Sequence, residues 1–262
     1  MSENILEINN LSKYFGGLAA VSNCSIKVKR GTITGIIGPN GSGKTTLFNL
    51  IAGNLKSSSG NVSFDGENIT DTASYELFSK GLLRTFQIAH EFSNLSVLEN
   101  LMMVPGNQSG EKLMTALLKP KLVAEEETLI KEKAKEVVDF LNLGHLTNEL
   151  AGNLSGGQKK LLELGRTMMV DAKLVLLDEV GAGVNRTLLK DLGTAIEKLN
   201  REKGYTFCMI EHDMDFIGRL CDPVIVMAEG SVLFEGSVED AKKDEKVIES
   251  YLGRGSKLKS EN

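Results

Sequence analysis

The stretch Gly38-Pro39-Asn40-Gly41-Ser42-Gly43-Lys44-Thr45 decides how the rest of this sequence is interpreted. It matches the pattern G-x-x-x-x-G-K-[ST] and lies between an apolar run at residues 32–37 and an apolar segment at 46–52 that opens with Thr46. The first run predicts a buried strand and the second a helix, which is the context that this pattern requires. Glycines allow successive N–H groups to face a polyphosphate, which Lys44 can reach, while the Thr45 hydroxyl can ligate Mg²⁺.

Composition places the chain among globular proteins. Its 262 residues, 41% of them hydrophobic, are enough for one large domain or two small ones. The net charge of −5 and the lack of a basic stripe interleaved with aromatics argue against a nucleic-acid partner. Cys24, Cys208 and Cys221 lie far apart in apolar surroundings, which predicts reduced core thiols. We expect neither a signal peptide nor a membrane span, so any membrane association comes through a partner.

An acidic pair follows a second predicted strand. Residues 174–177 form a continuous apolar run that is typical of a central parallel strand, and Asp178 and Glu179 come directly after it. A phosphate-loop enzyme needs a carboxylate that holds Mg²⁺ through its water shell, and Asp178 is the candidate for that role. Glu179 is the candidate general base, and an ordinary acidic turn is the alternative interpretation.

Three further polar features occur where predicted elements begin or end. The stretch Leu154-Ser155-Gly156-Gly157-Gln158 opens a predicted helix, whose hydroxyl and backbone N–H groups form a second anion site. Gln87 follows residues 84–86 where a helical region begins, and His212 follows a predicted strand at residues 205–210. Taken singly, a glutamine or a histidine at such a place is more typical of a structural residue.

The order of the predicted elements shows a helical segment inside a chain of mixed α/β texture. Residues 1–70 contain predicted strands joined by turns, which indicates antiparallel hairpins around the strand of the phosphate loop. One of these predicted turns is the aromatic turn Tyr14-Phe15-Gly16-Gly17. Residues 71–153 look helical, with apolar positions at helical spacing over 124–143. The mixed texture then returns, with a predicted helix at 187–200 and a hairpin around Glu229-Gly230.

Together these motifs resemble those of ABC-type ATPases, in which they occur in the same order. The correspondences are residues 38–45 with the Walker A loop, Gln87 with the Q-loop, 154–158 with the signature sequence, 174–179 with the Walker B strand and its catalytic glutamate, and His212 with the H-switch. The resemblance covers nearly the whole chain, and the signature sequence is specific because other P-loop enzymes lack it.

Within this family the chain looks most like the ATPase subunits of branched-chain amino acid importers. The similarity rests on residues 81–87, the long insert before the signature, and the segments 181–185, 211–214 and 247–253. Urea and short-chain amide importers share much of this pattern, and an ATPase of a lipid or lipopolysaccharide exporter is a further alternative. Val180 stands where the family usually has proline, and Arg186 where this subgroup often does, which affects loop rigidity rather than chemistry.

The resemblance implies an α/β fold, namely a P-loop NTPase core (RecA-like) with an antiparallel β-subdomain and an inserted helical subdomain. Residues 1–253 are expected to form a single ABC-type nucleotide-binding domain. The helical subdomain is expected at about residues 88–157, and residues 254–262 form a polar tail.

The resemblance also implies a role for each site residue. ATP is expected to bind to residues 38–46 and to a base-stacking aromatic, for which Phe15 is the closer match and Tyr14 the second. The metal ligands implied for Mg²⁺ are Thr45, Gln87 and Asp178, and the catalytic residues are Glu179, His212 and Gln87. In the family two domains sandwich two ATP molecules head to tail, so the signature residues act on the nucleotide of the opposite chain; they are Ser155, Gly156, Gly157 and Gln158.

The partners follow from the same resemblance. They are integral membrane permease subunits, a second ATPase subunit that is the same chain or a paralogue, and indirectly a solute-binding protein, with the chain at the cytoplasmic face of the cell membrane. A soluble non-transport ABC ATPase is a remote alternative, because its coiled-coil insert, zinc-binding insert or tandem domain is missing from the sequence. Permease contact is predicted for residues 87–97 through Ile88, Phe92 and Leu95; the alternative is that they fill the insert's own core.

Overall fold

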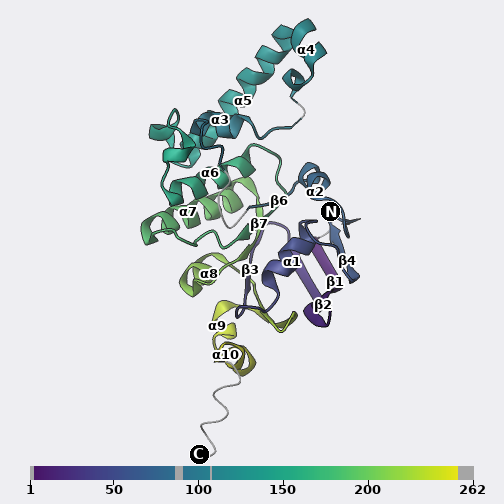
Figure 1. The fold of residues 1–262 in the computed structure, drawn as a ribbon. Coiled ribbons are helices and arrows are strands. Elements are labelled where there is room, and N and C mark those ends of the chain that lie inside the picture. The colour runs from purple at the N-terminus through teal and green to yellow at the C-terminus, as the bar shows by residue number, and fades with distance from the viewer. Residues whose placement is uncertain (1–2, 86–90, 107, 253–262) are drawn as a thin grey trace, which may run out of the picture. The chain divides into compact units, whose positions relative to one another are not determined.

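The computed structural model describes residues 3–85, 91–106 and 108–252, which fall into two compact units (Figure 1). The first unit contains residues 1–84, 173–181 and 197–262, and the second contains residues 85–172 and 182–196. The first carries both β-sheets, whereas the second is built from helices. The chain therefore leaves the first unit twice and returns to it each time.

The larger sheet of the first unit is predominantly parallel and has six strands in the order β10-β9-β3-β8-β7-β6. The central strands are entirely buried, which explains their continuous apolar sequences. The bounds of the six strands are Ile33–Ile37 for β3, Leu82–Arg84 for β6, Leu174–Asp178 for β7, Thr206–Ile210 for β8, Val224–Ala228 for β9 and Ser231–Gly236 for β10. Because β3, β7 and β8 run parallel, the residues that follow them meet at one edge of the sheet.

The smaller sheet of the first unit is antiparallel, with the order β2-β1-β4-β5. Its strands are β1 (Asn4–Phe15), β2 (Leu18–Lys29), β4 (Ser59–Phe64) and β5 (Glu67–Asn68). The alternation of buried and exposed residues in β2 shows that one face of this sheet packs on the core. The antiparallel hairpins predicted for the first part of the chain are therefore confirmed.

The hydrophobic core of the first unit surrounds helix α1 (Lys44–Ile51) and draws side chains from both sheets. Leu47 and Phe48 are completely buried in it, together with residues of β1, β2, β7 and β8. Replacing a buried phenylalanine such as Phe48 by alanine costs about 3 to 5 kcal/mol of folding free energy. This packing fixes α1, and with it the loop that precedes α1, against the two sheets.

The three cysteines are free and buried, as predicted. Burial raises the pKa of the Cys24 thiol to about 12 and that of the Cys208 thiol to about 12. The pKa of Cys221 is raised as well, first by burial and then by the neighbouring Cys208. The thiols therefore stay protonated at neutral pH and act as small core residues.

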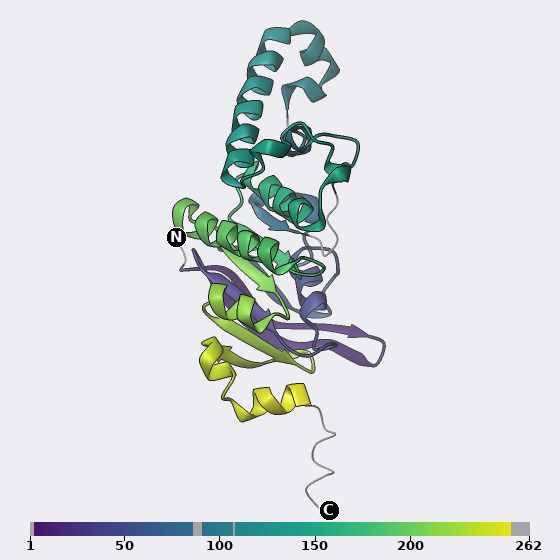
Figure 2. The same cartoon turned by 90° about the vertical axis from the view of Figure 1, so that its left-hand side faces the viewer.

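The remaining regular elements of the described residues are helices (Figure 2). In the second unit, the long helix α5 lies beside the short helix α4, and Ala134, Val137 and Val138 of α5 are buried as the helical spacing predicts. The bounds are Ser74–Lys80 for α2, Val97–Met102 for α3, Leu113–Leu118 for α4, Pro120–Phe140 for α5, Gly156–Met168 for α6, Arg186–Lys203 for α7, Met214–Leu220 for α8, Val238–Ala241 for α9 and Glu245–Leu252 for α10, with 3₁₀ turns at Ser109–Glu111, Gly144–Leu146 and Ala151–Asn153.

Two local predictions were wrong in detail. Strand β6 lies within the segment 71–153 that was predicted to be helical; it has only three residues and exists because it pairs with β7. Strand β1 extends through Tyr14 and Phe15, which were predicted to form a turn, because Phe15 pairs with Leu18 across the hairpin. Within the part of the chain that the structure describes, no helix is both long and apolar enough to cross a membrane.

Candidate functional site

The glycine-rich loop connects β3 to α1 in the first unit, as the sequence predicts. Gly43 precedes α1 with a positive φ of 97°, and a β-carbon there would lie 2.3 Å from the carbonyl oxygen of Ala20. At Gly38, where φ is 148°, a β-carbon would lie 2.1 Å from the carbonyl oxygen of Met227. Only glycine fits at these two positions, so the loop is held in one path by the backbone packed behind it.

A cavity of about 400 Å³ opens beside this loop within the first unit. Its volume is typical of a small-molecule site, and its wall combines residues of the glycine-rich loop with a phenylalanine, a histidine and charged side chains. The residues that line it are Phe15, Leu18, Ala19, Ala20, Asn40, Gly41, Ser42, Gly43, Lys44, Thr45, Thr46, Glu179 and His212. Thus Phe15 faces the cavity, whereas Tyr14 is not among these lining residues.

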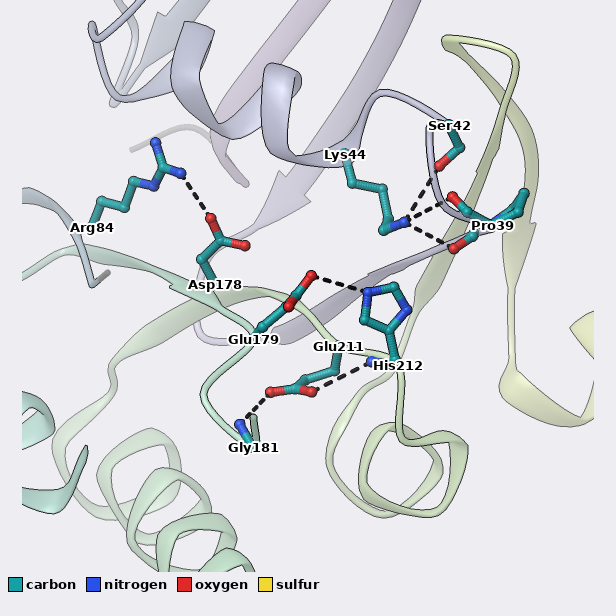
Figure 3. A network of polar contacts seen from close by, with 10 residues as sticks. Pro39, Ser42, Lys44, Arg84, Asp178, Glu179, Gly181, Glu211 and His212 are labelled. Carbon is teal, nitrogen blue, oxygen red and sulfur yellow. Dashed lines mark hydrogen bonds and ion pairs between the residues drawn. The ribbon is translucent and has the colours of Figure 1, made fainter. Parts of the chain in front are cut away.

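The side chain of Lys44 is held by backbone carbonyl groups of the loop that precedes it. Its Nζ donates hydrogen bonds to the carbonyl oxygens of Gly38, at 2.8 Å, and Pro39, at 3.0 Å (Figure 3). Burial lowers the pKa of the Lys44 ammonium, while the nearby carboxylates of Glu179 and Asp178 act in the opposite direction. The result is a cation fixed at the mouth of the loop, where an anionic ligand would meet it.

Asp178 ends β7 and forms a buried ion pair that the sequence did not reveal. Its Oδ2 atom accepts a hydrogen bond at 2.7 Å from Nη2 of Arg84 (Figure 3). Nη1 of Arg84 in turn donates to Oδ1 of Asn49 on α1. The side chains of Arg84 and Asp178 are only 11% and 6% exposed. Arg84 therefore links β6, β7 and α1. In the sequence, the position of Arg84 three residues before Gln87 was the only feature that indicated a role for Arg84 in the site.

Glu179 leaves β7 in a left-handed backbone conformation, with φ of 48°. That conformation costs a residue with a β-carbon about 1 to 2 kcal/mol, so the surroundings must hold it. The Glu179 amide donates to the carbonyl oxygen of Ile210 at 2.9 Å, and Oε1 of Glu179 lies 3.0 Å from Nε2 of His212. Two residues predicted separately from the sequence thus meet at the ends of adjacent strands.

Glu211 is a buried carboxylate that the sequence interpretation did not select as a site residue, although it lies in the segment 211–214 that supports the resemblance. Its Oε1 atom accepts a hydrogen bond from the amide of Gly181 at 2.8 Å, and Oε2 lies 3.4 Å from the amide of His212 (Figure 3). Burial raises the pKa of the Glu211 carboxyl, while the hydrogen bonds from the two amides act in the opposite direction. The sequence signal for a role in the site was its position directly after a buried strand and next to His212.

The signature residues begin helix α6 in the second unit. Ser155 and Gln158 form a capping box, in which the Ser155 hydroxyl accepts from the Gln158 amide and Oε1 of Gln158 accepts from the Ser155 amide. Gly156 and Gly157 form the first turn of the helix, and a β-carbon on Gly157 would lie 2.4 Å from Cδ1 of Leu188. Glycine at 157 therefore allows α6 and α7 to approach closely.

Some predictions fall on residues that the structure does not describe. Gln87 and Ile88 lie outside the described residues, as does the tail at 254–262. Within residues 3–85, 91–106 and 108–252, no group of three or more His, Cys, Asp or Glu side chains is arranged to hold a metal ion. A divalent cation here would need oxygen ligands from a bound phosphate as well as from Thr45 and Asp178, which is the usual manner of Mg²⁺ in phosphate sites.

Comparison with known proteins identifies close relatives of both the sequence and the fold. The ABC transporter family matches residues 21–182. A probable branched-chain amino acid transport ATP-binding protein LivG of Archaeoglobus fulgidus is 44% identical over 249 residues, which cover 95% of each chain. A nucleotide-free ATP-binding cassette from an ABC transporter matches with a TM-score of 0.82 and 40% identity, covering 96% of this chain and 100% of that one. An ATP-binding cassette of an ABC transporter in its ADP conformation matches with a TM-score of 0.82 and 39% identity, covering 97% and 100%.

Proposed function

The chain belongs to the ABC transporter family and is a transport-coupled ATPase of that family, and we propose that it energises the uptake of branched-chain or other hydrophobic amino acids. One observation supports this choice of solute, namely the 44% identity to the LivG relative over 95% of both chains. An importer of urea or amides, or an exporter of lipid or lipopolysaccharide, would use the same ATPase chemistry with another permease. The solute therefore has to be tested through the assembled transporter.

The cavity supports ATP as its ligand. Backbone amides of residues 40–45 and the fixed ammonium of Lys44 provide the positive lining that a polyphosphate needs, at the N-terminus of α1. Phe15 also lines the cavity, and its ring supplies a flat apolar surface for the base. In this proposal the phosphates bind to the loop and to Thr46, and the base stacks on Phe15 rather than on Tyr14.

The hydrolysis of ATP is assigned to Glu179 and His212, which follow β7 and β8. Glu179 lines the cavity, is close enough to Lys44 to influence its pKa, and would accept a proton from the attacking water. Nε2 of His212 lies within hydrogen-bond distance of Oε1 of Glu179, at 3.0 Å. His212 would therefore orient that carboxylate and contact the γ-phosphate. Gln87, which lies outside the described residues, keeps its proposed place near the attacking water.

The residues present fit a Mg²⁺ ion bound together with ATP. Thr45 lines the cavity and carries a hydroxyl oxygen, and Asp178 uses Oδ2 for Arg84, which leaves Oδ1 for the metal or its water shell. When bound, Mg²⁺ would neutralise charge on the phosphate oxygens and align them for attack. Thr45, Asp178 and Gln87 are proposed as its protein ligands.

We propose that the complete enzyme is a dimer of ATPase subunits. Ser155, Gly156, Gly157 and Gln158 would close on the γ-phosphate held by Lys44 of the opposite chain, which is the same chain or a paralogue. The capping box supports this role because it holds the first turn of α6, with its free N–H groups, in a rigid form. Residues 1–253 would then act as one nucleotide-binding domain, with its helical subdomain at about 88–157.

The permease is proposed to be a separate integral membrane protein that holds the chain at the cytoplasmic face of the membrane. Its contact surface is proposed at residues 87–97, where the Phe92 side chain is 48% exposed. The backbone of Phe92 is held in place, because its amide donates to Asn100 Oδ1 and its carbonyl oxygen accepts from Asn100 Nδ2. A fixed and half-exposed aromatic ring is typical of a protein contact.

The experiment is reconstitution of the chain with the integral membrane proteins and the solute-binding protein that copurify with it. ATPase activity in proteoliposomes should rise when the binding protein carries leucine, isoleucine or valine. If urea or a short-chain amide stimulated the ATPase activity instead, the proposed solute would be wrong and that compound would take its place. If lipid alone stimulated the ATPase activity, the chain would be assigned to an exporter. Copurification with no membrane protein would overturn the transport role.

A further inference from the structure

We propose that Glu211 is a positioning residue whose carboxylate holds the turn that carries Glu179, and this inference rests on the proposed role of Glu179 as general base. Glu211 is the first residue after β8, and Figure 3 shows its side chain directed at the turn that leaves β7. Its Oε1 atom accepts a hydrogen bond from the amide of Gly181, two residues beyond Glu179, at 2.8 Å.

This hydrogen bond continues the pairing of β7 with β8 beyond the end of the sheet. Asp178 and Ile210 form the last pair of the two strands, and the Glu179 amide then donates to the Ile210 carbonyl oxygen at 2.9 Å. At the next place along the turn, the Glu211 side chain supplies the acceptor for Gly181. The amide of Glu179 is thus fixed by a backbone carbonyl group, and the amide of Gly181 by a side chain.

The turn needs this support because its conformation is not one that the residues prefer. Glu179 has φ of 48°, and the next residue, Val180, lacks the ring with which proline would restrict the chain. Without the acceptor from Glu211, the residues after Glu179 could rotate and carry its carboxylate away from His212. The hydrogen bond to Gly181 therefore has a direct effect on the geometry of Glu179.

The burial of the Glu211 carboxylate indicates that its role is to accept hydrogen bonds. Glu211 is only 4% exposed, and an apolar side chain of similar size would fill the same space without the cost of removing a carboxylate from water. The amides of Gly181 and His212 are the partners that offset this cost. The same carboxylate thereby contacts both backbone segments that carry the Glu179 and His212 pair.

Two substitutions separate the acceptor from the charge. Glu211→Gln removes the charge and one of the two acceptor atoms, but its carbonyl oxygen lies at the same distance from the backbone and can still accept from Gly181; the longer contact of 3.4 Å with the His212 amide is the one that is lost. Glu211→Asp keeps the charge but is one methylene shorter, so it cannot reach. A purely electrostatic role would spare Glu211→Asp and damage Glu211→Gln, whereas the positioning role predicts the reverse.

The measurements are steady-state ATPase kinetics, thermal unfolding, and hydrogen exchange of the Gly181 amide by NMR. We expect kcat of Glu211→Asp to fall by about tenfold to a hundredfold, as for a small misplacement of a catalytic group. Its KM for ATP should change less than about twofold, because the loop around Lys44 does not use Glu211. Its Gly181 amide should exchange at least about tenfold faster. Glu211→Gln should lose at most about threefold in kcat and keep the amide protected.

The proposal is overturned if Glu211→Asp keeps both its kcat and the protection of Gly181, or if Glu211→Gln loses as much activity as Glu211→Asp. A parallel rise in KM would also contradict it. If the wild-type chain hydrolysed no ATP, the proposed function would fail instead. Even then, the exchange rates of Gly181 in the two variants would decide whether Glu211 holds the turn.

Discussion

The Nε2 atom of His212 lies 3.0 Å from Oε1 of Glu179, so the residues that follow two adjacent parallel strands share one hydrogen bond at the edge of the cavity. The backbone of Glu179 is not held by β7 alone. The Glu179 amide is bound to β8, and the His212 amide lies 3.4 Å from the Glu211 carboxylate. The two side chains therefore form a unit, and changes to either one should affect the same chemical step.

Glu179→Gln should bind ATP and stall before hydrolysis, because an amide keeps the shape of the carboxylate but cannot accept a proton from water. The rate of hydrolysis should fall by about a hundredfold or more. Since the opposite chain completes each proposed site, the stalled enzyme should form an ATP-dependent dimer on size-exclusion chromatography, alone or with a paralogous partner. Glu239→Gln on the exposed side of α9 is the control. A variant that stays monomeric with and without that partner, or that hydrolyses ATP at the wild-type rate, would falsify this role.

Lys44→Ala should lose hydrolysis by about a hundredfold or more, because it removes the cation that faces the phosphates. The fold should survive, since α1 is held by the core around Phe48. ATPase assays and thermal unfolding measure the two effects separately. Lys29→Ala is a suitable control, because the Lys29 side chain is 60% exposed and forms an exposed ion pair with Glu3. Wild-type turnover in Lys44→Ala would contradict the assignment of the loop.

Phe15→Ala should weaken ATP binding by about tenfold or more, which is the usual contribution of one base stacked on an aromatic ring. Tyr14→Ala is a matched control, because both aromatic side chains are 48% exposed and only Phe15 lines the cavity. Its dissociation constant should change by less than about twofold. Fluorescent nucleotide titration measures both variants. Equal losses would mean that the hairpin, rather than one ring, contributes the binding energy.

Phe92→Asp should uncouple transport while basal ATPase activity is preserved, because the ring is half exposed and lies far along the chain from the loop residues. Its ring also stacks with the guanidinium of Arg166, whose Cζ lies 5.6 Å from the ring centroid, so folding must be monitored by thermal unfolding. Leu129→Asp on the exposed side of α5 serves as control. Loss of transport, ATPase activity and folding together would favour the alternative that Phe92 fills the core of the insert.

Asp65→Asn should destabilise the first unit by about 1 kcal/mol at pH 7, because Asp65 pairs with Lys173 and Arg30. These partners, Lys173 first, lower the pKa of the Asp65 carboxyl. A carboxyl whose folded pKa is below the unfolded value of about 3.9 contributes stability above that pH and loses it as the pH falls through the folded value.

Urea unfolding at several pH values tests this sign. The difference between the wild type and Asp65→Asn should be present at pH 7 and should shrink as the pH falls below about 4. Glu67→Gln is the control, because the Glu67 side chain in its pair with Lys80 is 62% exposed, and its effect should stay below about 0.5 kcal/mol. A difference that grows towards low pH would contradict the prediction.

The sequence alone was sufficient for the features that are local in the chain. The phosphate loop, its strand and its helix are contiguous, and the loop binds through its own backbone, so eight residues and their flanks predict the site. The buried strand that ends in Asp178 and the helix that begins after Ser155 were recognisable for the same reason, since apolar periodicity and helix capping act over a few residues.

Only the tertiary structure decided which of these local features meet. Glu211 and Gly181 are 30 residues apart, and Arg84 and Asp178 are 94 apart, so no short pattern can relate them. They meet because β8 and β6 lie on either side of β7, an order that depends on the packing of the whole sheet. A single polar residue beside a motif carries no periodic signal, and its role therefore became visible only when the strands were placed side by side.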